Sequence, residues 1–94
     1  MFTDDDIPPK MRDKVAASDF ANVLKFDCGA DGVIVIDHQS VTTVDQDADC
    51  TLRLSRKNLE KLLRGNLNPA MAVMSGKVKI DGDMSLALQL AKLL

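Results

Sequence analysis

The sequence is poor in aromatic residues, with three phenylalanines and neither tryptophan nor tyrosine among 94 residues. Proteins that bind single-stranded nucleic acid stack bases on aromatic side chains, so we expect no nucleic-acid partner. No apolar run approaches the roughly 18 residues that a membrane span needs. The acidic start, Met1 to Asp6, lacks the basic and then apolar layout of a signal peptide. These absences predict a cytoplasmic protein.

Side chains that commonly carry catalysis or bind metals are also scarce. His38 is the only histidine, and Cys28 and Cys50 are the only cysteines. A catalytic nucleophile needs a base beside it, whereas His38 stands in an expected tight turn. The alternating acids of residues 45–49 lack the glycine and the later glutamate of a calcium-binding EF-hand loop. We therefore predict no catalytic residue, no metal site and no cofactor.

Length and composition are those of one ordinary globular domain. Hydrophobic residues make up 46% and charged residues 28% of the chain, and no linker divides it. We expect a single domain over residues 1–94, with residues 1–5 as a loose acidic tail. Residues 1–49 hold eleven acids and four lysines or arginines, whereas residues 50–94 hold three acids and eight. The basic half favours an anionic partner, or it is simply a solvated surface.

The first half of the chain predicts a short helix followed by a three-stranded meander. Asp6 and the following prolines are typical of a helix start, and that helix should end near Ser18. Residues 24–28 alternate between apolar and polar, and residues 33–36 are β-branched throughout. With residues 41–44 as a third strand, this order predicts an antiparallel sheet.

The second half predicts alternating strands and helices. The expected elements are a strand at 50–54, a helix from Ser55 to Arg64, a short helix from Pro69 to Met74, a strand at 77–81 and a final helix from Met84 to Leu94. The final helix is apolar nearly all round, so most of its surface must be covered. A partner, a membrane, a bound apolar ligand or close packing on the sheet would each cover it.

The order of short motifs in the second half resembles that of the sterol carrier protein 2 family. The motifs are Gly65-Asn66-Leu67-Asn68-Pro69, Gly76-Lys77-Val78-Lys79-Ile80 and Gly82-Asp83-Met84-Ser85-Leu86. The resemblance is close over residues 46–94 and limited to layout over residues 22–44. It implies an α/β (α+β) fold in which helices cover one face of a five-stranded mixed, mainly antiparallel sheet. Members bind sterols, fatty acids, fatty acyl-CoA or phospholipids, without chemical change, in an apolar tunnel between sheet and helices.

The resemblance also implies which residues line that tunnel. The family's lining elements correspond to Pro69–Met74, Val78–Ile80 and Met84–Leu94. The expected lining residues are Leu63, Met71, Met74, Val78, Ile80, Met84, Leu86, Leu88 and Leu90. Ser75 replaces a glutamine of the best-known members and is the candidate polar contact. Val73-Met74 replaces a pair of phenylalanines, which favours a fatty-acyl or phospholipid tail over a sterol.

We therefore predict a non-enzymatic lipid-binding domain, a monomer or a homodimer, that transfers or stores lipid. Several basic residues could meet a lipid headgroup or an anionic membrane surface: Arg53, Arg56, Lys57, Lys61, Arg64, Lys77 and Lys79. The alternative is an interaction or dimerisation module that uses the apolar C-terminal helix. A third interpretation is an enzyme of acyl groups, for which Cys28, His38 and Ser75 are the available side chains.

Overall fold

The computed structural model describes the backbone of residues 1–93 and the side chains of residues 1–90. Its strands are β1 (Val23–Asp27), β2 (Val33–Asp37), β3 (Ser40–Thr42), β4 (Cys50–Arg53) and β5 (Lys79–Gly82). Its helices are α1 (Pro9–Ala16), α2 (Arg56–Leu63), α3 (Pro69–Met74) and α4 (Met84–Leu93), with short 3-10 turns η1 (Asp4–Asp6) and η2 (Gly29–Asp31). The prediction that the last helix reaches Leu94 concerns a residue outside the described ones.

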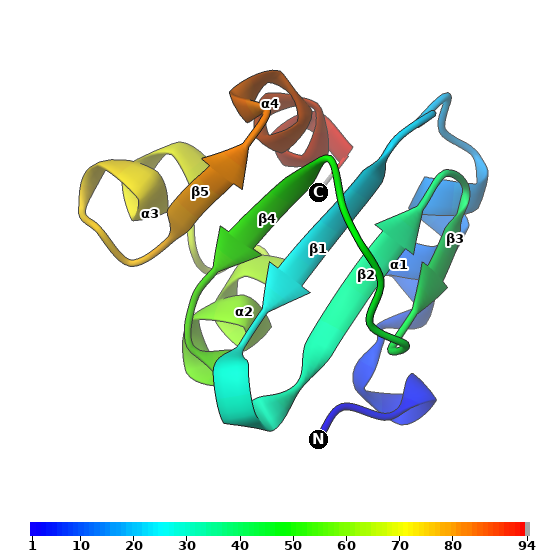
Figure 1. Ribbon diagram of the computed structural model, residues 1–94, viewed down its shortest axis with the longest axis horizontal. Coiled ribbons are helices and arrows are strands. Elements are labelled where there is room, and N and C mark those ends of the chain that lie inside the picture. Colours follow the sequence, from blue (N-terminus) through cyan, green and yellow to red (C-terminus); the bar gives the residue numbers. More distant parts are fainter. Residues whose placement is uncertain (94) are drawn as a thin grey trace.

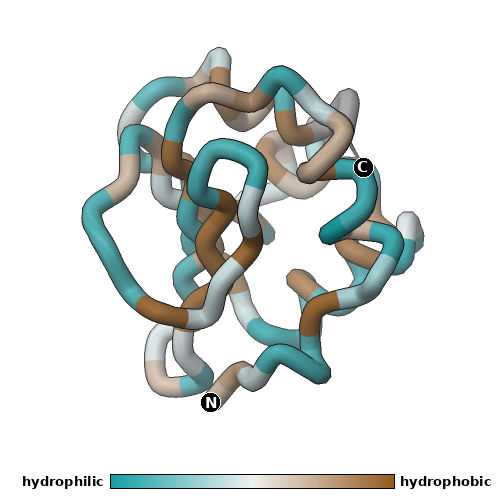
Figure 2. The backbone as a smooth tube through the Cα atoms, turned by 90° about the vertical axis from the view of Figure 1, so that its right-hand side faces the viewer, coloured by the Kyte–Doolittle hydropathy of each residue, from teal (hydrophilic) through white to brown (hydrophobic). Residues whose placement is uncertain are grey.

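The strands form one sheet in the order β3-β2-β1-β4-β5 (Figure 1). β1 and β4 pair in parallel, and the other neighbours pair antiparallel. The helices lie on one face, and the loop from β3 to β4 crosses the other (Figure 1). The predicted fold class, a mixed and mainly antiparallel five-stranded sheet covered by helices on one face, is therefore confirmed. Figure 2 shows that short hydrophobic stretches alternate with hydrophilic ones along the backbone.

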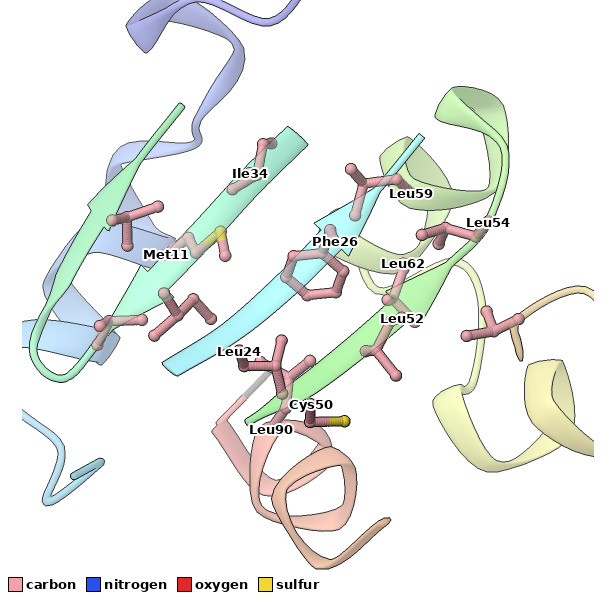
Figure 3. Packing of buried hydrophobic residues seen from close by; sticks show 14 of the residues in the cluster. Met11, Leu24, Phe26, Ile34, Cys50, Leu52, Leu54, Leu59, Leu62 and Leu90 are labelled. Carbon is pink, nitrogen blue, oxygen red and sulfur yellow. The ribbon is translucent and has the colours of Figure 1, made fainter. Parts of the chain in front are cut away.

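The core lies between the sheet and the helices. Phe26 of β1 is fully buried at its centre, with Leu59 and Leu62 of α2 packed nearby (Figure 3). Leu90 of α4 lies beside Leu24 and closes the end of this cluster (Figure 3). The first half of the chain, α2 and one face of α4 thus form a packed interior.

The β3–β4 loop is held against the outer face of the sheet by contacts with β1. Asp45 in that loop lies 2.6 Å from the Nζ atom of Lys25 on β1. At the end of the loop, the backbone N–H of Asp49 donates to the carbonyl of Val23 over 2.9 Å. These contacts place β4 beside β1, since a parallel pair needs a connection that crosses the sheet.

The N-terminus is ordered, which differs from the expected loose tail. Phe2 is buried, and its N–H donates to the carbonyl of Asp31. The guanidinium of Arg56 lies 4.8 Å from the centre of the Phe2 ring and 3.0 Å from a carboxylate oxygen of Asp6. Asp6 therefore ends η1 and anchors α2, while Pro8 takes the N-cap position of α1. Phe2 is a single aromatic residue in an acidic stretch, so no hydrophobic periodicity indicated its burial.

Gly82 marks the close approach of β5 to the end of the β3–β4 loop. A Cβ atom there would lie 2.5 Å from the carbonyl oxygen of Asp49, and the φ angle is +109°. We predict that Gly82→Ala lowers the free energy of unfolding by about 2 kcal/mol or more, because both the backbone and the neighbouring strand must shift. Gly29→Ala is the control, since its φ of +63° is strained but no atom lies within 4 Å. Urea denaturation of that variant should show a loss of about 1 kcal/mol in the free energy of unfolding. Equal losses in the two variants would show that the contact between Gly82 and Asp49 adds no constraint.

Candidate functional site

An apolar cavity of about 210 Å³ lies between α3, β5 and α4. Its residues are Leu52, Leu62, Pro69, Ala70, Val73, Met74, Val78, Ile80, Met84, Ala87, Leu88 and Leu90. Every one of them is apolar, and none carries a charge. Such a wall offers no group for chemistry and suits an apolar ligand that is held by exclusion from water.

The cavity has a buried inner wall and an exposed mouth. Leu52, Leu62, Val78 and Leu90 are buried and form the inner end, against the sheet and α2. Met74, Met84 and Leu88 are largely exposed although they line the same space. The cavity thus opens to solvent between Met74 of α3 and Met84 and Leu88 of α4.

Hydrogen bonds at the ends of α3 and α4 position the elements that line the cavity. The Asn68 side chain caps α3 by accepting the Ala70 N–H over 2.9 Å, and the carbonyl of Ala72 accepts the N–H groups of Lys77 and Val78. These bonds fold the chain back from α3 into β5. Asp83 then caps α4 by accepting the Ser85 N–H over 2.9 Å. The hydrogen bonds from the Ser85 hydroxyl and from the Ser85 N–H hold the pKa of Asp83 below its ordinary value.

Six of the nine expected tunnel residues lie on the cavity wall. They are Met74, Val78, Ile80, Met84, Leu88 and Leu90. The other three, Leu63, Met71 and Leu86, lie elsewhere because each is turned to another side of its helix. Leu86 is buried in the core, Met71 is exposed on α3, and Leu63 borders a second groove between α1 and α2.

Ser75, the expected polar contact, also lies away from the wall. It ends α3 as the C-cap residue, and its hydroxyl donates to the carbonyl of Ala72 over 3.3 Å. The described cavity therefore has no hydroxyl in its lining.

Sequence reasoning missed half of the wall. Leu52, Leu62, Pro69, Ala70, Val73 and Ala87 line the cavity but were not among the candidates. Leu52 pairs with Ile80 across β4 and β5, so the two side chains share one face of the sheet. The alternation of Leu52 with polar neighbours is a signal of an inward side chain, but the β4–β5 pairing that brings it to the cavity is not visible in either strand alone.

The side chains proposed for an acyl-processing enzyme do not come together. Cys28 follows the end of β1 that pairs with Val33, whereas His38 bonds to Asn22 at the opposite end. Six residues of extended chain separate these ends, about 20 Å. His38 is instead exposed, with its Nδ1 atom 2.6 Å from Asp37. Within residues 1–93, no three histidine, cysteine or acidic residues form a metal-binding cluster.

Two of the basic residues expected to meet a headgroup or a membrane are engaged in ion pairs. Arg53 is 3.5 Å from Asp81, and Arg56 is held by Asp6 and Glu60. Lys77 follows α3 close in sequence to Met74, and it has no ion pair in the described structure. None of the helices in the described residues is long and apolar enough to cross a bilayer.

Comparison with known families matches residues 6–94 to the SCP-2 sterol transfer family. The chain belongs to this family. Bovine sterol carrier protein 2 is 43% identical over 49 residues, which are 52% of this chain and 9% of the bovine protein. The chain thus spans about a tenth of the length of the curated relatives it matches. Family and fold together indicate a lipid-binding or lipid-transfer module.

Solved structures of other family members share the fold. Sterol carrier protein 2-like 3 from Aedes aegypti has a TM-score of 0.76 at 18% identity, covering 98% of this chain and 96% of that one. Palmitated SCP2L2 from the same organism has a TM-score of 0.72 at 20% identity, covering 98% and 94%. The SCP-2 fold is therefore present from end to end of the compared region.

Both thiols should be inert in the folded protein. Burial, together with the carboxylates of Asp31 and Asp27, raises the pKa of Cys28 to about 11, and burial also raises the pKa of Cys50. We predict that Ellman's reagent labels neither cysteine appreciably in the folded protein at pH 8 but labels both after unfolding in urea. The pKa of Cys28 in the folded protein lies above its ordinary value of 9.0, so ionisation of this thiol favours unfolding. The free energy of unfolding therefore keeps the full contribution of the neutral thiol below pH 9 and loses it between pH 9 and about 11. Rapid labelling of Cys28 in the folded state at pH 8 would revive the enzyme interpretation.

Proposed function

We propose that this SCP-2 domain binds the acyl chain of a fatty acid, a fatty acyl-CoA or a phospholipid in the cavity, without changing it chemically. The observation that carries the proposal is a wall made only of apolar side chains. A relative of the same fold is described as palmitated, which supports a fatty-acyl ligand for this cavity as well.

The dimensions of the cavity favour a flexible chain over a rigid sterol. Its volume of about 210 Å³ is below the roughly 300–1,000 Å³ of most ligand pockets. An acyl chain can enter part by part and keep its polar end outside, whereas a rigid ring system must enter as one body. Met74 and Met84, at the mouth, are unbranched side chains that can adapt to a chain of varying length.

Burial of methylene groups provides the affinity. Each methylene that moves from water into the cavity contributes about 0.8 kcal/mol, so ten of them contribute about 8 kcal/mol before ordering costs. The headgroup then lies at the mouth, beyond the apolar wall, and needs no buried partner. A carrier of this kind selects for chain rather than for headgroup, in agreement with the missing polar contact at Ser75.

Transfer requires contact with a membrane, and the lipid-exchange role proposed here includes a transient contact with an anionic surface. The exposed cations Lys57 and Lys61 on α2, with Arg64 at its C-cap, support an electrostatic component of that contact. The interaction-module alternative has less support, because Leu86 and Leu90 of α4 are already buried against this chain's own core. A monomer that carries lipid is therefore the favoured form.

We predict that Ala87→Phe lowers affinity for a long-chain fatty acid about fifty-fold. The new ring would occupy cavity volume and exclude about three methylenes, worth about 2.4 kcal/mol. Gln89→Phe is the matched control, since residue 89 lies on α4, is exposed and does not line the cavity. The measurement is a fluorescence titration with a fatty-acid probe, and both variants should unfold at temperatures close to wild type.

Native mass spectrometry of the freshly purified protein, with solvent extraction, identifies any lipid that travels with it. One extractable acyl lipid per chain supports the proposal. Equal affinities of the two phenylalanine variants would place the ligand outside the cavity. A lipid-free dimer that ignores added fatty acid, acyl-CoA and phospholipid would favour the interaction module instead.

A further inference from the structure

Exposed apolar side chains gather at the mouth of the cavity. In the described residues, six large apolar side chains are exposed, and four of them lie on α3 and α4: Met71, Met74, Met84 and Leu88. We call these four residues the methionine rim. The other two, Met1 and Val44, lie at the N-terminus and after β3. Scattered exposed side chains need no explanation, but a group on two helices that line the same cavity marks an interaction surface.

Met71 shows that the rim extends beyond the ligand cavity. Its side chain is 64% exposed and is not part of the cavity lining. Residues three apart lie on neighbouring positions of a helix, so Met71 and Met74 form one apolar strip along α3. Its place in the cavity lining explains an apolar side chain at Met74, but it does not explain the exposed apolar side chain of Met71.

The segments that carry the rim are free of charge. Residues 66–76, which contain α3, and residues 84–91, which form most of α4, hold no charged side chain in a chain that is 28% charged. Lys77 follows directly after the first of these segments and is exposed. Asp83, which precedes the second, is engaged with the Ser85 hydroxyl over 2.6 Å. The surface is therefore an apolar patch with an available cation at its border.

We propose that the methionine rim docks on a lipid bilayer with the mouth of the cavity facing the acyl region. The proposal rests on the proposed function, because it gives the acyl chain a path from bilayer to cavity that does not cross water. Met71, Met74, Met84 and Leu88 enter the interface, and Lys77 lies at the level of the phosphates.

A bilayer fits this surface better than a partner protein does. Met74, Met84 and Leu88 belong both to the rim and to the cavity wall, so the docking surface and the cavity are continuous. A protein bound over these side chains would close the mouth, whereas a bilayer supplies the ligand through it. Unbranched methionine side chains also suit a fluid partner without fixed shape.

Met71→Asp tests the rim without altering the cavity wall. The control is Val44→Asp, which places the same charge on an exposed apolar position far from α3 in sequence and in a different element. Vesicles of phosphatidylcholine with phosphatidylglycerol provide the membrane. We expect Met71→Asp to lower the binding constant of the protein for these vesicles about tenfold. It should also slow the uptake of a fluorescent fatty acid from vesicles. Its affinity for the same fatty acid added as monomer should stay at the wild-type value.

The outcomes separate this proposal from the proposed function. Wild-type vesicle binding by Met71→Asp, or an equal loss in Val44→Asp, overturns docking by the rim even if monomeric fatty acid is bound. Failure of the wild-type protein to bind monomeric fatty acid overturns the proposed function, and the proposal that rests on it falls too. Self-association of the wild-type protein that Met71→Asp abolishes, seen by sedimentation velocity, assigns the rim to a protein interface and also overturns docking.

Discussion

The parallel pairing of β1 with β4 is the constraint on which both the core and the cavity depend. It joins a strand of the first half to one of the second, and it requires the chain to cross the outer face of the sheet. Lys25 and Asp45 hold that crossing in place. Once β4 is fixed, its free edge accepts β5, which α3 precedes and α4 follows along the chain (Figure 1). The cavity is the space that these short elements leave unfilled.

The two halves of the chain consequently differ in how they bury apolar surface. The first half forms a densely packed interior around Phe26, to which the N-terminal Phe2 is added. The cavity lining, by contrast, comes from residues 52–90 alone, and its outer part is supplied by exposed methionine and leucine side chains. Dense packing provides stability, whereas the partly open wall leaves the space that we propose an acyl chain enters.

Much of this arrangement could be predicted from the sequence because periodicity and caps are local signals. The α3 boundaries, the order of strands along the chain and the buried Ile34-Val35-Ile36 segment followed from such patterns. The wall was predicted only in part, since helix faces depend on which side meets the sheet: Leu63 and Leu86 are apolar but point away from the cavity. The anchoring of Phe2 by Arg56 joins residues more than fifty positions apart, and no local pattern reports such a contact.

We have proposed that an acyl chain occupies the cavity between α3, β5 and α4. The five methionines allow it to be tested with ¹³C-methyl labels and NMR, as fatty acid is added to the protein. Met74 and Met84 line the cavity, whereas Met11 lies on the buried face of α1 and does not line it. A fatty acid in the cavity should cause saturable shifts of the Met74 and Met84 methyl signals at one fatty acid per chain, with Met11 unchanged. Shifts at Met11 with none at Met74 or Met84 would contradict the proposal and place the ligand elsewhere.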